Sequence, residues 1–452
     1  MMHDVIILGG GPAGYLAAER AGGAGMNVAL VEKRNLGGVC LNEGCVPSKT
    51  ILHSSKLYSH ALHAQKYGVS AKEVSFDLAT VMQRKNKIIQ ALRKGIGTTM
   101  KKFKVTVEGG EGRILPKKGD DFQVQVGDKI LAGKKLLITT GSEAIRIPVP
   151  GADQDFVYTN REILDIDFIP QNFVVIGGGV IGLEIATFFA EVGSKVTVVE
   201  LLPAIAGPID SEISGILQKE LAKKGITFKL NCKVTAIGDK LVTYEADGKA
   251  ESVSADIVLM SVGRRPLTKD IGLENLNVYI ERGAIAVDEH GRTSIPNVWA
   301  AGDVNGTSML AHTAYREGEV CINDMLGKPD IMRYNAIPGV IYTHPEVATV
   351  GYSESEAIDK GHQVASAKLP LSYNGRYLAE TEGGRGICKV VIDKTYGTLL
   401  GVHIIGSACS EMIYGAAAMI EAELRVEDIK EIVFPHPTVS EIIKDTLRHA
   451  KT

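Results

Sequence analysis

The sequence lacks the features that mark secreted, membrane-spanning or nucleic-acid-binding proteins. No apolar run approaches the roughly 20 residues that cross a bilayer. The first residues also lack the basic start and small-residue cleavage site of a signal peptide. The net charge of −3 provides no electrostatic reason to bind nucleic acid or an anionic membrane. These absences predict a cytoplasmic protein that has neither nucleic acid nor membrane among its partners.

Cysteine is also scarce, with only six residues in a chain of 452. That number is too small for the disulfide framework of a secreted protein. None of the cysteines forms a CxxC pair, so no structural zinc or other metal site is predicted. Two of them, Cys40 and Cys45, lie only five residues apart and require a separate explanation. The other four are predicted to be inert thiols: Cys232, Cys321, Cys388 and Cys409.

The chain does contain a complete dinucleotide-binding pattern near its start. The apolar run Val5–Leu8 is typical of a buried parallel strand, and Gly9, Gly11 and Gly14 follow it in a G-x-G-x-x-G arrangement. Such glycines permit a tight turn and let a pyrophosphate approach the N-terminus of the next helix. Glu32 ends the second strand 18 residues after Gly14, where an acid accepts ribose hydroxyls.

The same pattern occurs again 168 residues later, with its glycines at Gly177, Gly179 and Gly182. Glu200 lies 18 residues after Gly182, as in the first copy. A carboxylate at this position repels a 2′-phosphate, and the next residues, Leu201–Leu202, include no arginine, so NAD is favoured over NADP. Two dinucleotide sites in one chain indicate electron transfer between two bound dinucleotides.

The order of patterns predicts an α/β protein with two Rossmann-like domains, the second inserted in the first, and a C-terminal α+β domain. Residues 298–303 (VWAAGD) resume the strand-then-glycine style of the first domain. Within the last domain, strands are expected at 386–392 and 398–405 and helices at 410–422 and 438–450. The predicted domains are 1–147 with 268–334, 148–267, and 335–452.

The spacing of Cys40 and Cys45 sets a geometric condition. Five residues along a regular α-helix separate Cα atoms by roughly 8.7 Å. A disulfide tolerates at most roughly 7 Å. If the two cysteines are joined, the chain between them must depart from a regular helix, and Gly44 is the residue that permits this. Otherwise the cysteines are two buried structural thiols.

Several motifs together then point to one family. In chain order they are CLNEGCVPSK, the doubled GGGxxG, TTGS, SVGRRP, AAGDV, MLAHTA, YTHPEVATVG and HPTVSE. Across nearly its whole length the chain resembles the dihydrolipoamide dehydrogenase family of pyridine nucleotide–disulfide oxidoreductases. The resemblance implies a homodimer, through a C-terminal dimerisation domain, that uses FAD to oxidise protein-bound dihydrolipoamide and reduces NAD+. The implied partner is the lipoyl domain of a 2-oxoacid dehydrogenase complex or a glycine cleavage H-protein. No lipoyl domain precedes residue 1, so the partner is expected to be a separate protein.

The resemblance also implies roles for individual residues. Cys40 corresponds to the thiol that meets the substrate and Cys45 to the thiol that faces the flavin, while His436 and Glu441 correspond to an acid–base pair from the other subunit. The positions implied for FAD are Gly9, Gly11, Gly14, Glu32, Lys49 paired with Glu184, Gly112, Thr140, Gly141, Ser142, Asp303, Met309, Leu310, Ala311 and His312. The positions implied for NAD are Gly177, Gly179, Gly182, Glu200, Val234 and Gly263.

Three positions fit more than one interpretation. Glu441 fits a capping box, Thr438-Val439-Ser440-Glu441, as well as a catalytic pair. Glu43 departs from the family, which usually has an apolar residue there, and we expect its carboxylate to point to solvent because it otherwise raises thiol pKa values. Arg264-Arg265 fits either a turn or a contact with NAD phosphate.

The sequence also bears on three rival functions. Glutathione reductase requires an NADP site, and mercuric reductase requires a vicinal C-terminal cysteine pair. A non-catalytic dinucleotide-binding subunit needs neither the cysteine pair nor His436. The sequence favours the dehydrogenase over all three.

Overall fold

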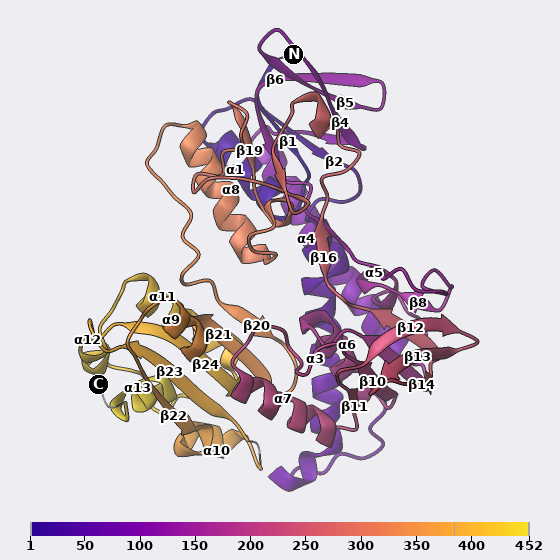
Figure 1. Ribbon diagram of the computed structural model, residues 1–452, viewed down its shortest axis with the longest axis vertical. Coiled ribbons are helices and arrows are strands. Elements are labelled where there is room, and N and C mark those ends of the chain that lie inside the picture. Colours follow the sequence, from indigo (N-terminus) through magenta and orange to yellow (C-terminus); the bar gives the residue numbers. More distant parts are fainter. Residues whose placement is uncertain (1, 384, 451–452) are drawn as a thin grey trace.

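The computed structural model of the protein describes residues 2–383 and 385–450. Its first sheet has seven strands in the order β3-β2-β1-β6-β5-β4, with β19 paired to β6 (Figure 1). The strands are β1 (Met2–Leu8), β2 (Val28–Glu32), β3 (Thr106–Gly109), β4 (Gly112–Lys118), β5 (Asp121–Val126), β6 (Lys129–Ile138) and β19 (Val298–Ala300). β1, β2, β3, β6 and β19 run parallel, with Val5 opposite Val28 and Lys135. Because β19 joins this sheet, the chain returns to the first domain after completing the second, as predicted.

Helices α1 (Pro12–Gly23) and α8 (Ala311–Met325) pack against each other beside this sheet. Their alanines and glycines allow the close packing, and Ala17, Ala18 and Ala21 are fully buried. The long helix α4 (Leu78–Lys102) begins at Asp77, whose side chain accepts a hydrogen bond from Thr80 N (3.2 Å) as an N-cap. Helices α2 (Gly38–Glu43) and α3 (Cys45–Leu62) and the 3-10 turn η1 (Ala64–Tyr67) lie between α1 and α4 in the chain.

A second, parallel sheet has the order β11-β10-β9-β15-β8. Its strands are β8 (Val157–Tyr158), β9 (Asn172–Ile176), β10 (Lys195–Val199), β11 (Thr227–Lys229) and β15 (Ile257–Met260), with helices α5 (Asn160–Ile163), α6 (Val180–Glu191) and α7 (Ser211–Lys223). The antiparallel strands β12 (Lys233–Gly238), β13 (Leu241–Ala246) and β14 (Lys249–Ser254) form a separate three-stranded sheet. The apolar runs of β9 and β15 are buried on both faces, as parallel strands covered by helices require. This inserted unit is the second Rossmann-like domain.

Two short ladders follow the second sheet. β7 (Ser142–Ala144) pairs with β16 (Arg264–Pro266), and β17 (Ile280–Glu281) pairs with β18 (Ala284–Ile285). The remaining 3-10 turns are η2 (Leu273–Asn275), η3 (Asp303–Asn305) and η4 (Leu371–Tyr373). The β7–β16 ladder joins the end of the first sheet to the chain that leaves the second sheet.

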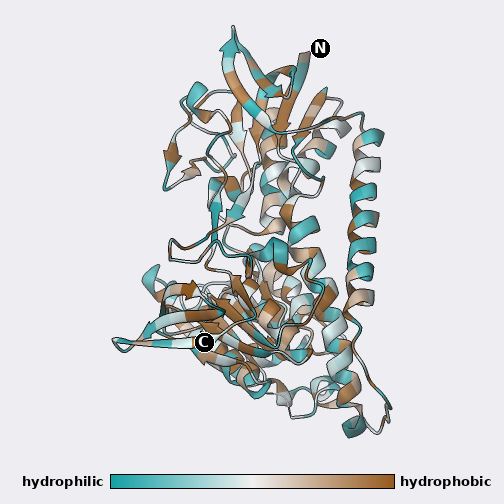
Figure 2. Cartoon of the chain, turned by 90° about the vertical axis from the view of Figure 1, so that its right-hand side faces the viewer, coloured by the Kyte–Doolittle hydropathy of each residue, from teal (hydrophilic) through white to brown (hydrophobic). Residues whose placement is uncertain are grey.

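The third sheet is antiparallel, with the order β20-β21-β24-β23-β22. Its strands are β20 (Gly339–Ile341), β21 (Glu346–Gly351), β22 (Val364–Pro370), β23 (Ile387–Asp393) and β24 (Leu399–Gly406), with helices α9 (Glu354–Asp359), α10 (Gly375–Glu380), α11 (Cys409–Glu421), α12 (Val426–Glu431) and α13 (Glu441–Arg448). Each of the three large sheets packs against an apolar core, and brown strands are visible in Figure 2. None of the helices in the described ranges is long and apolar enough to cross a membrane.

The sequence predicted β23, β24 and α11 to within a residue or two. The prediction for the last helix was wrong at its start, because α13 begins at Glu441 rather than at Thr438. Its N-cap is Ser440, which makes no side-chain capping bond. Residues 438–440 instead form a turn, in which the Thr438 hydroxyl donates to Pro435 O (2.7 Å). Of the two bonds of the possible capping box, the one from Thr438 N to the Glu441 carboxylate is present (2.9 Å), while the Thr438 hydroxyl is engaged with Pro435 O.

Candidate active site

A cavity of about 1440 Å³ lies where the three parts of the chain meet. The first glycine loop, both closely spaced cysteines, residues 140–142 and residues 309–312 all line it. The second domain contributes residues 159–162, and the third contributes residues 338–342. The cavity is large enough for a dinucleotide and is walled by segments far apart in the sequence.

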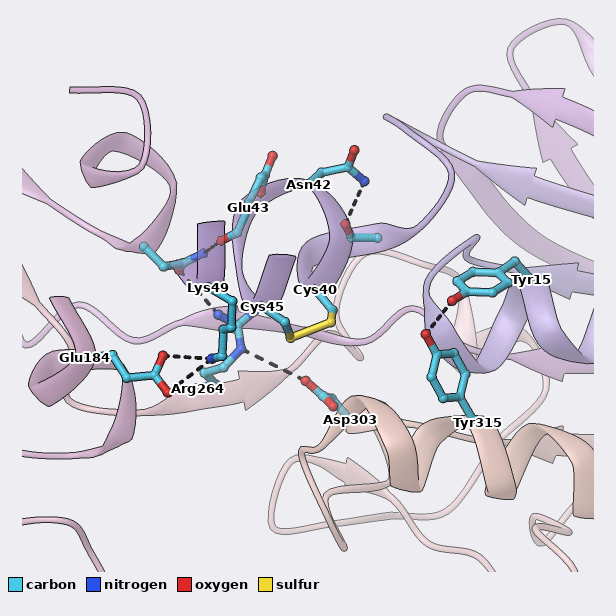
Figure 3. Close-up of a disulfide and its surroundings, with 12 residues drawn as sticks. Tyr15, Cys40, Asn42, Glu43, Cys45, Lys49, Glu184, Arg264, Asp303 and Tyr315 are labelled. Atoms are coloured by element: carbon cyan, nitrogen blue, oxygen red, sulfur yellow. Dashed lines mark hydrogen bonds and ion pairs between the residues drawn. A yellow bond between two sulfur atoms is a disulfide. The ribbon is translucent and has the colours of Figure 1, made fainter. Parts of the chain in front are cut away.

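Cys40 and Cys45 are joined as a disulfide in the wall of this cavity (Figure 3). Their Cα atoms are 4.6 Å apart, much closer than a regular helix allows. The helix is interrupted at Gly44, which separates α2 from α3 with φ −152° and ψ −107°. A Cβ at Gly44 would lie 3.1 Å from Val39 O. The geometric condition set by the sequence is therefore met, and the break falls at the predicted glycine.

The turn between the cysteines is anchored from α4. The Asn42 amide donates to Gly38 O (2.8 Å) and to Leu36 O (3.2 Å), and its oxygen accepts from Arg93 Nη2 (2.7 Å) and Nε (3.1 Å). The Asn42 side chain thus bonds the start of the short helix α2 and links this helix to α4. Sequence reasoning did not identify Arg93, because a basic residue 51 positions away gives no local signal.

Glu43 lies between two arginines. Its carboxylate accepts from Arg34 Nη1 (3.1 Å) and Arg161 Nε (2.8 Å), and its side chain is 21% exposed. Figure 3 shows the side chain directed away from the two sulfur atoms. The prediction that the Glu43 carboxylate points to solvent was therefore wrong, because the carboxylate forms ion pairs with two arginines. It correctly excluded contact with the sulfur atoms.

Lys49 forms the predicted pair with Glu184. Lys49 Nζ lies 2.8 Å and 3.1 Å from the two carboxylate oxygens, and the Glu184 side chain is 4% exposed. Glu184 also accepts a hydrogen bond from Tyr342 N (3.0 Å), and the Lys49 ammonium lies 4.4 Å from the centre of the Tyr342 ring. The pair therefore joins α3, α6 and the third domain at the cavity wall.

The first glycine loop has the geometry that a pyrophosphate needs. Gly9 has φ +114°, and a Cβ there would lie 2.3 Å from Thr139 O. A Cβ at Gly14 would lie 1.8 Å from Gly9 O, so neither position tolerates a side chain. Glu32 accepts hydrogen bonds from Gly10 N and Arg34 N, both at 2.7 Å, which fixes its carboxylate beside the loop. This part of the cavity fits the adenosine diphosphate portion of a dinucleotide.

The second glycine loop repeats this geometry. Gly177 has φ +100°, and a Cβ at Gly182 would lie 2.3 Å from Gly177 O. Glu200 accepts from Gly178 N (2.5 Å) and Leu202 N (2.7 Å), as Glu32 does in the first copy. In the described part of the chain, the cavity wall includes none of the positions predicted for NAD: Gly177, Gly179, Gly182, Glu200, Val234 and Gly263.

Two of those NAD positions have particular surroundings. Gly263 has φ +119°. The Val234 side chain is buried in the core of the second domain, so only its backbone is available to a nucleotide. Their roles toward NAD stay a prediction.

Most of the positions predicted for FAD do line the cavity. They are Gly9, Gly11, Glu32, Lys49, Gly112, Thr140, Gly141, Ser142, Glu184, Asp303, Met309, Leu310, Ala311 and His312, whereas Gly14 is buried behind the loop. Ser142 Oγ donates to the Asp303 carboxylate and accepts from Arg264 Nε (2.7 Å). Arg264 also donates to Ser142 O (2.8 Å) and Asn160 Oδ1 (3.3 Å). Arg264 is therefore a residue of β16 whose side chain joins two domains, so the turn alternative was wrong, and a contact with NAD phosphate stays a prediction.

Two tyrosines were not foreseen from the sequence. The Tyr15 and Tyr315 hydroxyls are 2.5 Å apart, between α1 and α8. Burial and the Tyr315 hydroxyl raise the pKa of Tyr15, so it stays protonated. No local pattern marks either residue, because their contact spans 300 positions.

His436 and Glu441 contact each other but lie outside this cavity. His436 Nδ1 is 3.1 Å and 3.2 Å from the Glu441 oxygens, and the His436 side chain is 81% exposed. Glu441 also accepts from Thr438 N (2.9 Å), so its carboxylate serves the turn and the imidazole together. The bond from Thr438 N and the bond and charge of His436 lower the pKa of Glu441. Across residues 2–383 and 385–450, a single chain does not bring this pair to the cysteines.

Comparison with known proteins agrees with this geometry. Residues 3–318 match the family model described as pyridine nucleotide-disulphide oxidoreductase, and residues 337–447 match the dimerisation domain of that family. The chain is 38% identical to dihydrolipoyl dehydrogenase of Geobacillus stearothermophilus, covering 97% of this chain and 94% of that protein. It is 40% identical to dihydrolipoyl dehydrogenase 3 of Pseudomonas putida, with 98% and 97% covered.

Solved structures show the same arrangement of domains. LpdA from Mycobacterium tuberculosis superposes with a TM-score of 0.90 at 26% identity, covering 98% of each chain. A HOCl-induced flavoprotein disulfide reductase from Escherichia coli superposes with a TM-score of 0.87 at 26% identity, covering 99% of each chain. The predicted fold class is confirmed, as is the predicted family, and the third domain is a dimerisation domain. The chain belongs to the pyridine nucleotide-disulphide oxidoreductase family.

Proposed function

We propose that the protein is a dihydrolipoyl dehydrogenase, which oxidises protein-bound dihydrolipoamide to lipoamide and reduces NAD+ to NADH with FAD as its cofactor. The observation that carries the proposal is the Cys40–Cys45 disulfide in the wall of a cavity that also contains a dinucleotide-binding glycine loop. Its support is the similarity, over nearly the full length, to proteins named dihydrolipoyl dehydrogenase. Its rivals in the family, which reduce other disulfides, are distinguished by the substrate test below.

The first glycine loop and the cavity behind the disulfide form the proposed FAD site. We expect Glu32, which accepts a hydrogen bond from Gly10 N, to accept hydrogen bonds from ribose hydroxyls as well, and Asp303 and Ser142, which bond each other, to contact the cofactor further along the cavity. Lys49, held by Glu184, provides a cation beside the cysteine pair. Bound FAD supplies two-electron transfer between the cysteine pair and NAD+.

The cysteines exchange sulfur bonds with the substrate. A thiolate of dihydrolipoamide attacks Cys40 Sγ, which forms a mixed disulfide and releases Cys45 as a thiolate. The second substrate thiol then loses its proton and attacks the sulfur bonded to Cys40, which closes the lipoamide ring and frees the Cys40 thiol. Two electrons and two protons have then left the substrate, and the electrons reside in the cysteine pair.

A base is needed because a thiol with an ordinary pKa of about 8.5 is only a few per cent thiolate at pH 7. We assign this role to His436 of the partner subunit. Its imidazole, 81% exposed in the single chain, is free to face a second subunit. Glu441 bonds Nδ1, which leaves Nε2 to take the proton from the substrate and to return it later.

NAD+ is assigned to the second glycine loop. Glu200, fixed by two backbone N–H groups, favours free ribose hydroxyls over a 2′-phosphate. The finer assignments also belong to the proposal: a lipoyl domain of a separate protein as the partner, a homodimer as the working unit, and the cytoplasm as the location.

The test is turnover of dihydrolipoamide with NAD+ by Cys40→Ser and Cys45→Ser. Both variants are expected to keep FAD, measured by its absorbance, and to lose turnover by more than about a thousandfold, because neither can form the disulfide. Cys232→Ser removes a thiol outside the cavity and is the matched control. Full turnover in either active-site variant would contradict the proposal, as would wild-type preference for glutathione disulfide with NADPH.

A further inference from the structure

Glu43 is held by the second domain at two atoms. Asn160 and Arg161 are consecutive residues at the start of α5. The Asn160 amide donates to the main-chain oxygen of Glu43 (2.7 Å), and Arg161 Nε donates to its carboxylate (2.8 Å). Glu43 is the last residue of α2, directly before the break at Gly44. One turn of the second domain therefore fixes the point at which the chain bends to join the two cysteines.

Glu43 also places a negative charge near the sulfur atoms, and its two arginine partners balance that charge. Cys40 and Glu43 are separated by three positions on α2, which brings their Cβ atoms to roughly 5–6 Å. The carboxylate alone would disfavour a thiolate on the cysteine pair, while the guanidinium groups of Arg34 and Arg161 favour it. With an apolar residue at position 43 there would be no carboxylate near the sulfur atoms, and no arginine would be required to balance it.

We propose that Glu43 and Arg161 form a positioning pair that sets how readily the Cys40–Cys45 disulfide is reduced. Neither residue touches the reacting atoms; they act through the charge near the thiolate and through the turn they hold. The inference rests on the proposed function only in that this disulfide is the group that accepts electrons.

The reaction affected is exchange with a dithiol. The disulfide gains two electrons and two protons from the dithiol, which becomes a cyclic disulfide, and one of the released cysteine thiols ionises. Charges on the helix that carries Cys40, at an effective dielectric constant of about 20 and with arginine side chains 47% and 45% exposed, change such an equilibrium by about 3- to 10-fold. A tenfold change corresponds to about 30 mV for two electrons.

The experiment measures the equilibrium between the FAD-containing protein and dithiothreitol redox buffers at pH 7, with reduced cysteines counted by alkylation and mass spectrometry. Glu43→Gln is expected to favour reduction by about 3- to 10-fold, and Arg161→Gln to disfavour it by a similar factor. The double variant should return to within about twofold of the wild type, since both charges are gone. Arg161→Lys, which keeps the charge, should also stay near the wild type.

Arg265→Gln is the matched control. Arg265 also lines the cavity, but it pairs with Glu143 (2.8 Å) rather than with Glu43, so the equilibrium should not move. The inference is overturned if Glu43→Gln and Arg161→Gln leave the equilibrium unchanged, whether or not the melting temperature falls, or if they shift it in the same direction. Failure of the proposed function looks different: the cysteine pair would equilibrate with dithiothreitol in every variant, but dihydrolipoamide would not be oxidised.

Discussion

The Glu191 carboxylate gives a quantitative test of how the second and third domains are held together. It lies at the end of α6 with its side chain 3% exposed, and it accepts hydrogen bonds from His344 Nδ1 (2.8 Å), Lys224 Nζ (3.0 Å) and Ser55 Oγ (2.7 Å). Burial alone would raise the pKa of this carboxyl. The hydrogen bond and charge of His344, together with Lys224, outweigh burial and lower the pKa from 4.5 to about 2.

Replacing Glu191 by glutamine, which resembles the protonated acid, should lower the free energy of unfolding by about 3 kcal/mol at pH 7. This magnitude follows from the difference between 4.5 and about 2 at 1.36 kcal/mol per pKa unit. Because the pKa is depressed in the folded protein, the stabilisation is fully present above about pH 4.5 and disappears as the pH falls toward 2. The difference between wild type and variant should therefore fall to about half its neutral value by pH 3.

Urea unfolding at pH 7 and pH 3, followed by circular dichroism, measures both quantities. Glu427→Gln is the control, because Glu427 pairs with Lys430 on the surface (2.9 Å, 74% exposed) and should contribute less than about 0.5 kcal/mol. A difference for Glu191→Gln below about 1 kcal/mol at pH 7 would refute the reasoning. A difference that widens as the pH falls would refute it as well.

Three further predictions concern the candidate active site. His436→Gln should reduce turnover of dihydrolipoamide by about 10²- to 10⁴-fold with FAD content unchanged. Glu441→Gln should reduce turnover less, since the imidazole remains. Equal turnover in the wild type and both variants would remove the pair from the mechanism. Gly44→Ala should lower the free energy of unfolding by about 1–2 kcal/mol, and the melting temperature with it, because the new Cβ would lie 3.1 Å from Val39 O. Unchanged thermal unfolding would show that the turn relaxes freely. Lys49→Met leaves the buried Glu184 carboxylate without its cation, so the free energy of unfolding measured in urea should fall by about 2–4 kcal/mol. Adding Glu184→Gln to Lys49→Met should recover part of that loss.

Local patterns in the sequence were enough for the elements that carry the site. The apolar runs before Gly9 and Gly177 became parallel strands because such runs are stable only when buried on both faces. The break at Gly44 followed from the spacing of two cysteines and the length of a disulfide. In each of these cases the signal and the structure lie within about 25 residues of each other.

Contacts between domains left no such signal. The contact of Glu43 with Arg161 was missed because Arg161 lies 118 residues away and belongs to another domain. The start of the last helix was misplaced for a different reason. The acid at position 441 can complete a capping box or bond only a backbone N–H of a turn; here it accepts from Thr438 N, while the Thr438 hydroxyl bonds Pro435 O and Ser440 Oγ. Sequence spacing alone does not separate these two outcomes.

The contacts of α6 explain how the disulfide, the inserted domain and the dimerisation domain keep a common geometry. Glu184 and Glu191 are seven residues apart, so they lie on one face of this helix, two turns from each other. Glu184 bonds Lys49 of α3 and the main-chain N–H of Tyr342. Glu191 bonds Ser55 of α3 and the ring of His344. Tyr342 and His344 both lie in the segment before β21.

The repeated arrangement fixes rotation as well as distance, because two bonded points along a helix define its orientation against both neighbours. α3 begins at Cys45, and the third domain contains His436. The two acids of α6 therefore hold the disulfide and the histidine-bearing domain in a fixed relation within each chain. If the partner subunit supplies His436 to this cavity, as proposed, the acids of α6 that hold the disulfide of one site would also position the base for the other.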